Sequence, residues 1–407
     1  MQDNEKKPAL RFKGFTDPWE QRKLGEIAVF SKGVGYSKND LCEEGTPIIL
    51  YGRLYTKYET SIFDVDTFVK EKAGSVYSKG GEVIVPASGE TAEDISIASV
   101  VVKPGILLGG DLNVVSPTTE YDSAFLALTI SSGAAHEYLS SLAQGKSVVH
   151  LHNADIQSVS AKFPTKREQE KIHLLFGKID TLITLHQRKY EKLVNIKKSM
   201  LDKMFPQNGV SVPEIRFKGF TDPWEQRKLD ELGTIVTGST PSTTNDAYYA
   251  DDGLLWVTPT DITKNITCES ARKLSASGQK VARVVPRNTI LVTCIASIGK
   301  NTMLANAGSF NQQINGLTPD ENKYVPYFLL TESVLWSAKM KVLAATGTLQ
   351  IINRTEFSEI KTFLPSFDEQ KRISQYFEKL DTLITLHQRK LEKLQNIKKS
   401  CLEKMFV

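Results

Sequence analysis

The sequence has few cysteines, and their spacing excludes two common kinds of small scaffold. Only four occur in 407 residues, and no two form a CxxC pair. They are Cys42, Cys268, Cys294 and Cys401. Zinc ribbons and disulfide scaffolds need closely or regularly spaced cysteines, so the sequence argues against both and fits a reducing cytoplasm.

Long apolar runs are also missing. No stretch approaches the roughly 18 apolar residues that a membrane span needs. The polar start, MQDNEKKPAL, lacks the apolar core of a secretion signal. We therefore expect a soluble, cytoplasmic protein. Its net charge is only +4, so the composition predicts no uniformly basic surface.

Familiar catalytic motifs are absent or incomplete. The Asn/Asp-Pro-Pro-Tyr/Phe motif of amino-methyltransferases does not occur. The string AQGKS ends like a phosphate-binding loop, but Ser140 stands where that loop needs glycine. His150 and His152 can share one face of a strand, but no third metal ligand is evident, which favours a structural or DNA-facing role. We expect no catalytic residue, metal or cofactor in this chain.

The chain carries a large internal repeat. A length of 407 residues with 40% hydrophobic residues predicts two or three folded cores. The string RFKGFTDPWEQRKL occupies residues 11–24 and again residues 216–229. Residues 168–205 and 369–406 agree at 27 of 38 positions, including an unbroken DTLITLHQRK. Two copies of one unit are therefore present, and we expect a pseudo-twofold molecule.

Each copy ends in a segment that predicts a long helix. Apolar or large residues recur there in steps of four and three, which is heptad spacing. In the first copy they are Ile172, Phe176, Ile179, Ile183, His186, Tyr190 and Leu193. A helix of this length spans roughly 55 Å and exposes its apolar stripe unless a partner covers it. We expect the two helices to pair antiparallel as a coiled coil. The alternative is that each lies on its own domain.

Two histidines, His186 and His387, fall on this stripe. One interpretation is a partly buried histidine satisfied locally. The other is a polar residue that fixes the register of the helices.

The segments between the repeats differ almost completely in sequence but not in their order of elements. We call residues 25–165 the first body and residues 230–366 the second body. Strand-like runs are TPIILYGRLY, GEVIVPASG and IASVVV in the first, and LLWVTP, ARVVP and NTILVTCIASIG in the second. In each body these runs are followed by one helical stretch, at residues 123–143 in the first and 325–345 in the second. This order predicts a mixed α/β (α+β) fold with a twisted sheet.

The repeat also predicts the domain limits, with PQNGVSVPEI as a linker between the copies. They are a first target domain at 11–165, a first long helix at 166–205, the linker at 206–215, a second target domain at 216–366 and a second long helix at 367–406.

Short strings in the second body resemble the specificity (S) subunit of type I restriction–modification systems. They are GSTPST at 238–243, WVTPTDI at 256–262, SIGKNT at 297–302 and NQQIN at 311–315. A proline followed by EQKRI or EQEKI, at the entry to each long helix, resembles the same family. The first body departs from the pattern, with GVGYSKND where a GxTPS loop stands in the commoner version.

The resemblance implies a subunit without catalytic activity of its own. Each body is expected to recognise one half of a split double-stranded DNA target, and the helices to hold the bodies apart. Two methyltransferase (M) subunits, which bind S-adenosylmethionine, and endonuclease/translocase (R) subunits are the implied partners. Rival interpretations are a coiled-coil scaffold that reads no DNA and a stand-alone DNA-modifying enzyme.

The charge distribution agrees with DNA binding. Residues 166–205 carry a net charge of +5 and residues 366–406 carry +3, which leaves −4 for the rest of the chain. The pairs Lys197–Lys198 and Lys398–Lys399 stand at matching positions and can contact phosphate, although a solvated helix face looks the same.

Base reading requires polar side chains on loops. The candidates in the first body are Tyr36, Lys38, Arg53, Tyr55, Lys57, Ser88 and Glu90. Those in the second body are Thr240, Ser242, Thr258, Thr260, Lys300, Gln312, Gln313 and Arg354. Each is also compatible with an ordinary polar loop position. Trp19 and Trp224, in the repeated 14-residue string, are expected to pack where each body joins the helices.

Overall fold

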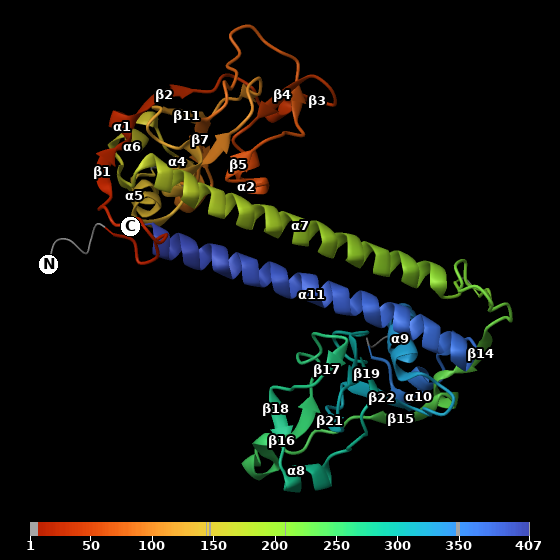
Figure 1. Cartoon of the computed structure of the whole chain (residues 1–407). Coiled ribbons are helices and arrows are strands. Elements are labelled where there is room, and N and C mark those ends of the chain that lie inside the picture. The colour runs from red at the N-terminus through yellow and green to blue at the C-terminus, as the bar shows by residue number, and fades with distance from the viewer. Residues whose placement is uncertain (1–6, 144, 146–147, 208, 347–350, 407) are drawn as a thin grey trace. The chain divides into compact units, whose positions relative to one another are not determined.

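The computed structural model describes residues 7–143, 145, 148–207, 209–346 and 351–406 (Figure 1). The chain divides into two compact units. The first comprises Met1–Arg188 with Gln388–Val407, and the second comprises Lys189–His387. Each unit therefore contains one body and a part of both long helices.

The first copy of the repeat is built from short strands and helices that lead into one long helix. In chain order these are β1 (Glu20–Lys23), α1 (Leu24–Ile27), β2 (Ala28–Lys32), η2 (Lys38–Asp40), β3 (Leu41–Cys42), β4 (Thr46–Ile49), α2 (Arg53–Thr56), β5 (Ser61–Ile62), β6 (Phe68–Val69), β7 (Glu82–Pro86), β8 (Ser88–Gly89), α3 (Ala92–Ile95), β9 (Ser99–Val101), β10 (Leu107–Leu108), β11 (Leu112–Pro117), α4 (Ser123–Ile130), α5 (Gly133–Leu142), β12 (Val149–His150), α6 (Asn153–Ser158), β13 (Ser160–Phe163) and α7 (Lys166–Met204).

A five-stranded sheet in the order β2-β11-β7-β9-β5 forms the centre of this body. All residues of its middle strand, β7, are buried. Side chains alternate across a strand, so Val83 and Val85 enter the core that includes α4 and α7, whereas Ile84 enters a separate core. Both faces of the sheet are therefore covered, which explains the continuous apolar run in the sequence. A smaller sheet has the order β10-β4-β6-β3.

The second copy of the repeat also consists of strands and helices that lead into one long helix. Its elements are β14 (Glu225–Lys228), η3 (Leu229–Glu231), β15 (Gly233–Thr237), η4 (Asp246–Tyr248), β16 (Tyr249–Val257), β17 (Ile266–Thr267), β18 (Arg272–Leu274), α8 (Ala276–Val281), β19 (Ile290–Thr293), β20 (Asn301–Leu304), β21 (Gly308–Phe310), β22 (Ile314–Pro319), α9 (Pro326–Thr346), α10 (Arg354–Ser358), β23 (Lys361–Leu364) and α11 (Phe367–Met405).

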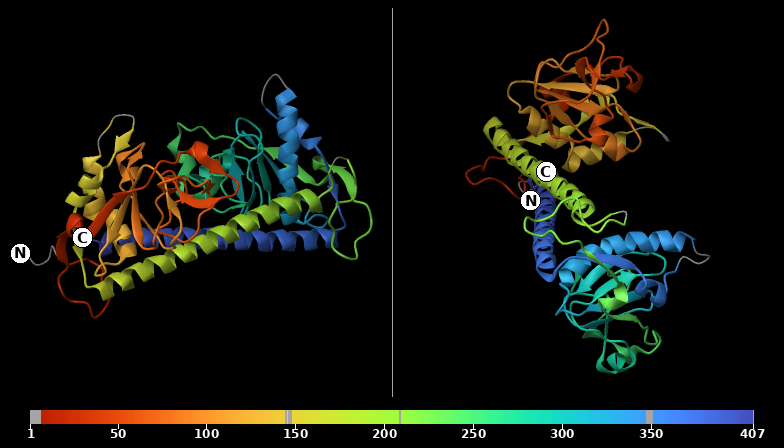
Figure 2. Two further views of the ribbon diagram at one scale, coloured as in Figure 1. Left: turned by 90° about the horizontal axis from the view of Figure 1, so that it is seen from above. Right: turned by 90° about the vertical axis from the view of Figure 1, so that its right-hand side faces the viewer.

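The central sheets of the two bodies have equivalent strand orders. That of the second body is β15-β22-β19-β20-β17, and a smaller sheet has the order β18-β16-β21. In each central sheet the last strand, β5 or β17, runs parallel to its neighbour. Figure 2 shows α9, in light blue, lying across the strands of its own body. The predicted mixed α/β fold with an internal repeat is confirmed.

The repeated 14-residue string closes each body against its long helix. Its EQRK residues form β1 and β14, which pair antiparallel with β13 and β23, the strands just before the long helices. Arg11 forms two hydrogen bonds to Glu168, of 2.7 and 2.8 Å. Arg216 forms two to Glu369, of 2.7 and 2.6 Å. We call these two ion pairs the clasps.

The glutamine after each clasp glutamate also has a fixed role. Gln169 donates to the carbonyl of Pro164 and accepts from the backbone N–H of Asp122, just before α4. Gln370 makes the equivalent bonds to Pro365 and to Val325, just before α9. The repeated proline and Glu-Gln therefore tie three segments together.

The long helices pair antiparallel within each unit, as expected, and the alternative of two separate helices is wrong. In the first unit the ring of Phe176 on α7 contacts Phe406, just after α11, with centroids 6.1 Å apart. In the second unit Phe377 on α11 contacts Phe205, just after α7, at 5.9 Å. Trp19 and Trp224 are buried beside Phe125 and Phe328, which confirms their predicted place at the join.

Three local predictions are wrong. The stretch at residues 123–143 is divided into α4 and α5, because Gly133 has a φ of +59° that interrupts a helix. The YGRLY part of a predicted strand instead forms a turn and the start of the short helix α2. The run ARVVP forms no strand and only an isolated bridge from Val285 to Gly308.

No helix in the described part of the chain is both long enough and apolar enough to cross a lipid bilayer.

Candidate nucleic-acid interface

Four loops of the second body meet at one edge, where β15, β16, β19 and β21 end. The Ser239 N–H donates to the Phe310 carbonyl at 2.9 Å, and the Asn311 N–H donates to the Val257 carbonyl at 3.0 Å. The Cys294 N–H donates to the Gln313 carbonyl at 2.8 Å. These backbone bonds bring residues 238–242, 258–260, 294–300 and 311–313 together. We call them the loop cluster.

The loop cluster contains seven of the eight residues predicted for this body. They are Thr240, Ser242, Thr258, Thr260, Lys300, Gln312 and Gln313. Lys300 extends to the Pro259 carbonyl at 3.4 Å, and the Thr258 hydroxyl donates to Asp261 at 2.6 Å. Beside these loops lies an open pocket of about 420 Å³, lined by Ala296, Ser297, Ile298, Gly299, Lys300, Lys341, Ala344 and Ala345. The cluster presents hydroxyl, amide and ammonium groups, the types that hydrogen-bond to base edges.

Arg354 belongs to a further segment, which adjoins the cluster through Ile352. It lies exposed at the start of α10, two residues after Ile352, whose N–H donates to the Cys294 carbonyl at 2.9 Å. Its predicted role in DNA contact stays a prediction.

A basic segment beside the cluster escaped the sequence reasoning. Residues 271–288 contain five basic residues and no acidic residue, a signal that was present in the sequence. The five are Arg272, Lys273, Lys280, Arg283 and Arg287. The backbone N–H of Arg283 donates to the Ser239 hydroxyl at 2.8 Å, and its guanidinium bonds to the Thr237 carbonyl. Arg272 lies 4.0 Å from the centroid of the Tyr249 ring. This segment supplies positive charge next to the loop cluster.

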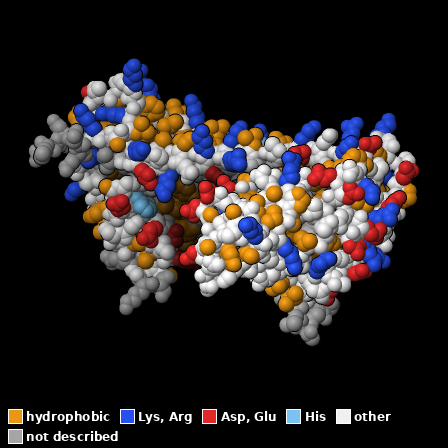
Figure 3. Space-filling model, turned by 90° about the horizontal axis from the view of Figure 1, so that it is seen from below, with side chains coloured by type: hydrophobic (Ala, Val, Ile, Leu, Met, Phe, Trp, Pro, Cys, Tyr) orange, Lys and Arg blue, Asp and Glu red, His pale blue; other side chains and the backbone are white. Residues whose placement is uncertain are grey.

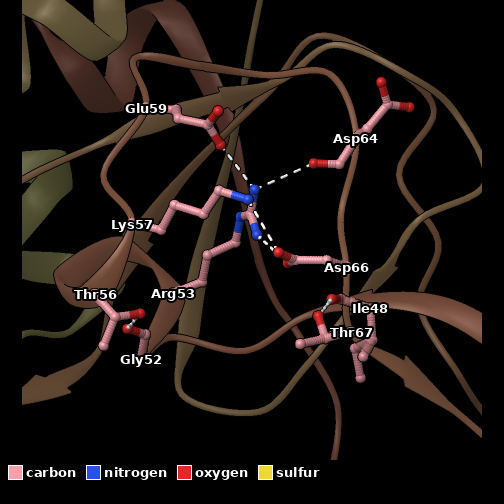
Figure 4. A network of polar contacts seen from close by, with 9 residues as sticks. All are labelled: Ile48, Gly52, Arg53, Thr56, Lys57, Glu59, Asp64, Asp66 and Thr67. Carbon is pink, nitrogen blue, oxygen red and sulfur yellow. Dashed lines mark hydrogen bonds and ion pairs between the residues drawn. The ribbon is translucent and has the colours of Figure 1, made fainter. Parts of the chain in front are cut away.

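In the first body, Arg53 lies inside a polar network (Figure 4). Its guanidinium pairs with Glu59 at 2.7 Å and with Asp66 at 2.8 Å, and it donates to the Asp64 carbonyl. Lys57 pairs with the same Asp66 at 3.0 Å. Only 9% of Arg53 is exposed, so its guanidinium is engaged within the body.

Three more first-body candidates also have internal partners. Tyr36 is buried, and its hydroxyl bonds to Ser75 at 2.6 Å. The Tyr55 hydroxyl donates to the carbonyl of Ser88, which is itself buried in β8, and burial raises the pKa of Tyr55. Lys38 and Glu90 are exposed. Sequence reasoning thus selected a mixture of internal and surface groups, and their contact with DNA stays a prediction.

The helix lysines divide into two classes. Lys197 pairs with Asp381 at 2.6 Å in the second unit, and Lys398 pairs with Asp180 at 2.6 Å in the first. Lys198 and Lys399 are exposed. The first lysine of each doublet is therefore engaged between the helices, and only the second remains on the surface. Figure 3 shows basic side chains interspersed with acidic and apolar ones on one face, rather than gathered in one basic patch.

The remaining candidates for metal or nucleophile chemistry have the following surroundings where the structure describes them. His150 and His152 are exposed, and no group of three metal-ligating side chains occurs among the described residues. Burial raises the pKa of Cys294 to about 12, which keeps this thiol protonated. In the AQGKS string, residues 144, 146 and 147 lie outside the described residues. His186 and His387 on the helix stripe are partly buried, and each has an interaction partner.

Comparison with known proteins gives a consistent result. The profile of a family described as "Type I restriction modification DNA specificity domain" matches twice, at residues 16–195 and 221–396. The HindI specificity subunit of Haemophilus influenzae is 27% identical over 248 residues, which is 58% of this chain and 50% of that protein. The chain thus matches about half the length of this relative. The MjaVIII specificity subunit of Methanocaldococcus jannaschii is 21% identical over 94% of this chain and 91% of that protein.

A solved structure shares the fold over almost the whole chain. The S subunit of a type I restriction–modification system from M. genitalium superposes with a TM-score of 0.69 at 14% identity, covering 98% of this chain and 99% of that one.

Proposed function

Because the chain belongs to the family of type I restriction–modification DNA specificity domains, we propose that it selects the DNA target of a restriction–modification complex. Each body reads one half of a bipartite sequence in double-stranded DNA. The loop cluster and the basic segment at residues 271–288 form the reading face of the second body. The corresponding face of the first body includes Lys38 and Glu90.

One observation carries this proposal. The two units repeat the clasps and the helix contacts residue for residue, whereas the loops between them differ almost completely. A pure scaffold has no need for two different polar loop sets on one repeated frame. Two different half-sites require that combination, because base edges are read by side chains and the frame supplies only position.

The repeated helix surface suits two copies of one partner. Leu182 and Leu185 on α7 are 45% and 48% exposed, and Leu383 and Leu386 on α11 are 42% and 43% exposed. Exposed leucines at matching positions on two helices favour identical partner surfaces. We propose that one methyltransferase subunit docks on each, and that endonuclease subunits join this complex. S-adenosylmethionine is then bound by the methyltransferase, and this chain makes no catalytic contribution.

The length of the helices has a role in the same proposal. Each contains 39 residues, which corresponds to about 58 Å at 1.5 Å per residue. We propose that this length sets the number of unread base pairs between the half-sites.

Methylation mapping tests the function. The chain is co-expressed with its methyltransferase in cells without other DNA methylation, the complex is isolated, and methylated positions are sequenced. The expected motif has two specific halves and a fixed unread spacer, and it disappears when this chain is omitted. Methylation that is equally strong without the chain, or a complex that forms but produces no sequence motif, would indicate a scaffold and refute the proposal.

A further inference from the structure

One aspartate of the repeated DTLITLHQRK joins three elements in the second unit. One oxygen of Asp381 on α11 pairs with Lys197 of α7 at 2.6 Å. Its other oxygen accepts hydrogen bonds from the Asn265 amide and the Tyr327 hydroxyl, both at 2.8 Å. Asn265 and Tyr327 belong to the second body. The side chain of Asp381 is only 18% exposed, whereas Asn265 lies on the surface of the body.

The first unit has the equivalent junction. Asp180 on α7 pairs with Lys398 of α11 at 2.6 Å. Its second oxygen accepts from the Thr60 hydroxyl of the first body at 3.1 Å. The ammonium of Lys398 also lies 5.9 Å from the centroid of the Tyr58 ring. The helix residues are the same in both units, while the residues that the bodies contribute differ.

The two body donors nevertheless occupy one topological position. Thr60 directly precedes β5 and Asn265 directly precedes β17, the parallel edge strands of the central sheets. The carbonyl of Thr60 accepts from the Val100 N–H, and that of Asn265 accepts from the Met303 N–H, both at 2.9 Å. Two sequences with almost no identity thus place a side-chain donor at the same point of the fold. Packing of the body alone requires no such donor.

The geometry of DNA explains why this point matters. One base pair advances the helix by about 3.4 Å and rotates it by about 35°. A body that pivots on its helices by a comparable amount meets the groove one base pair out of place. A fixed spacer therefore requires a fixed orientation of each body on the helices. Hydrogen bonds to a charged carboxylate are strong and directional enough to supply it.

We propose that Asp180 and Asp381 are positioning residues that fix the orientation of each body on the helix pair and thereby the spacer of the target. They act through Thr60 in the first unit and through Asn265 and Tyr327 in the second, without touching DNA. This inference rests on the proposed function and adds to it the residues that control spacing.

The test uses body-side variants in the complex with methyltransferase. Asn265→Ala and Tyr327→Phe remove donors to Asp381 and leave its ion pair with Lys197 intact. Thr60→Val does the same for Asp180. Methylation is measured on DNAs that carry the native half-sites with the native spacer or with one base pair more or fewer. We expect the preference for the native spacer to fall about tenfold, the effect of losing one hydrogen bond to a charged group, with unchanged bases in both half-sites.

Three further variants separate positioning from general stability. Tyr324→Phe is the matched control, because it removes a tyrosine hydroxyl for which no hydrogen bond to another described residue is found. It should keep the native spacer preference. Asp381→Asn removes the charge and should lose the preference for the native spacer. Asp381→Glu keeps the charge and should retain part of that preference.

The outcomes are distinct. A uniform loss of methylation at all spacers, or an altered half-site sequence, would overturn the positioning role, as would an unchanged spacer preference in all body-side variants. Failure of the proposed function looks different, because the unaltered chain would then direct no bipartite methylation.

Discussion

Glu332 is the most unusual single residue of the second body. It lies on α9 and is fully buried, with one oxygen bound to the Thr362 hydroxyl and the other without a hydrogen-bond partner. Burial raises the pKa of this carboxyl to about 8. The indole of Trp336 donates to the same Thr362 at 3.1 Å. A protonated Glu332, Thr362 and Trp336 therefore form a small hydrogen-bonded group inside an apolar core.

The stability of this body should depend on pH through Glu332. The folded pKa exceeds the unfolded value of 4.5, so the folded chain holds a proton that the unfolded chain releases. Stability is therefore lost as pH rises from about 4.5 to about 8, by ~1.4 kcal/mol per pH unit. Glu332→Gln removes this titrating group. Between pH 6 and pH 9, its free energy of unfolding, measured by denaturant titration, should therefore fall less than that of the unaltered chain.

The exposed Glu269→Gln is the control for this measurement and should keep the slope of the unaltered chain. An equal pH slope in Glu332→Gln would show that the carboxyl is already ionised in the folded state at neutral pH.

At the scale of elements, the clasps determine how each repeated string meets its helix. The Glu369 side chain is 1% exposed and its only ion-pair partner among the described residues is Arg216. The hydrogen bond to Glu369 raises the pKa of Arg216, so this guanidinium stays charged throughout the accessible pH range. Removing the arginine leaves a buried carboxylate without compensation.

Arg216→Ala should therefore lower the free energy of unfolding of the second unit by about 3–5 kcal/mol, as broken buried ion pairs do. Chemical denaturation followed by tryptophan fluorescence measures the change. Arg227→Ala breaks two ion pairs, with Glu225 and Glu231, but all three side chains are exposed, so the midpoint should stay almost unchanged. Similar midpoints for both variants would contradict a structural role for the clasp.

The sequence predicted these elements unevenly. Heptad spacing and the repeat gave both long helices, because 39-residue helices carry a strong periodic signal. The break at Gly133 was missed, because a single glycine with φ +59° is indistinguishable in sequence from a tolerated helical glycine. Motifs singled out seven residues that the structure brings together in the loop cluster, but they did not reveal that Arg53 is engaged within the body, since its partners Glu59 and Asp66 lie on a loop whose path the sequence does not show.

At the scale of the whole molecule, the proposal that helix length sets the spacer predicts a change in the DNA target. One heptad is inserted near Leu193 of α7 and one near Leu394 of α11. Seven residues preserve the apolar stripe and lengthen each helix by about 10 Å. The methylated motif should keep both half-sites and gain about three unread base pairs, at 3.4 Å each. Methylation sequencing gives the new spacer.

Seven residues inserted into the linker at 206–215 are the control, because they lengthen the chain without lengthening a helix. That variant should keep the original spacer. A folded, active heptad variant with the original spacer would show that helix length does not set the distance.

The shared position of Thr60 and Asn265 has a consequence for exchanging parts between proteins. Two local features join a body to the helices and the repeated string. The first is a last strand that pairs with EQRK, in the register of Glu20 with Phe163 or Glu225 with Leu364. The second is a side-chain hydrogen-bond donor just before the edge strand of the central sheet. A graft that cuts within β1 and β13, or within β14 and β23, leaves the frame whole. Donor bodies for chimeric readers can then be chosen by these two local features instead of by overall sequence similarity.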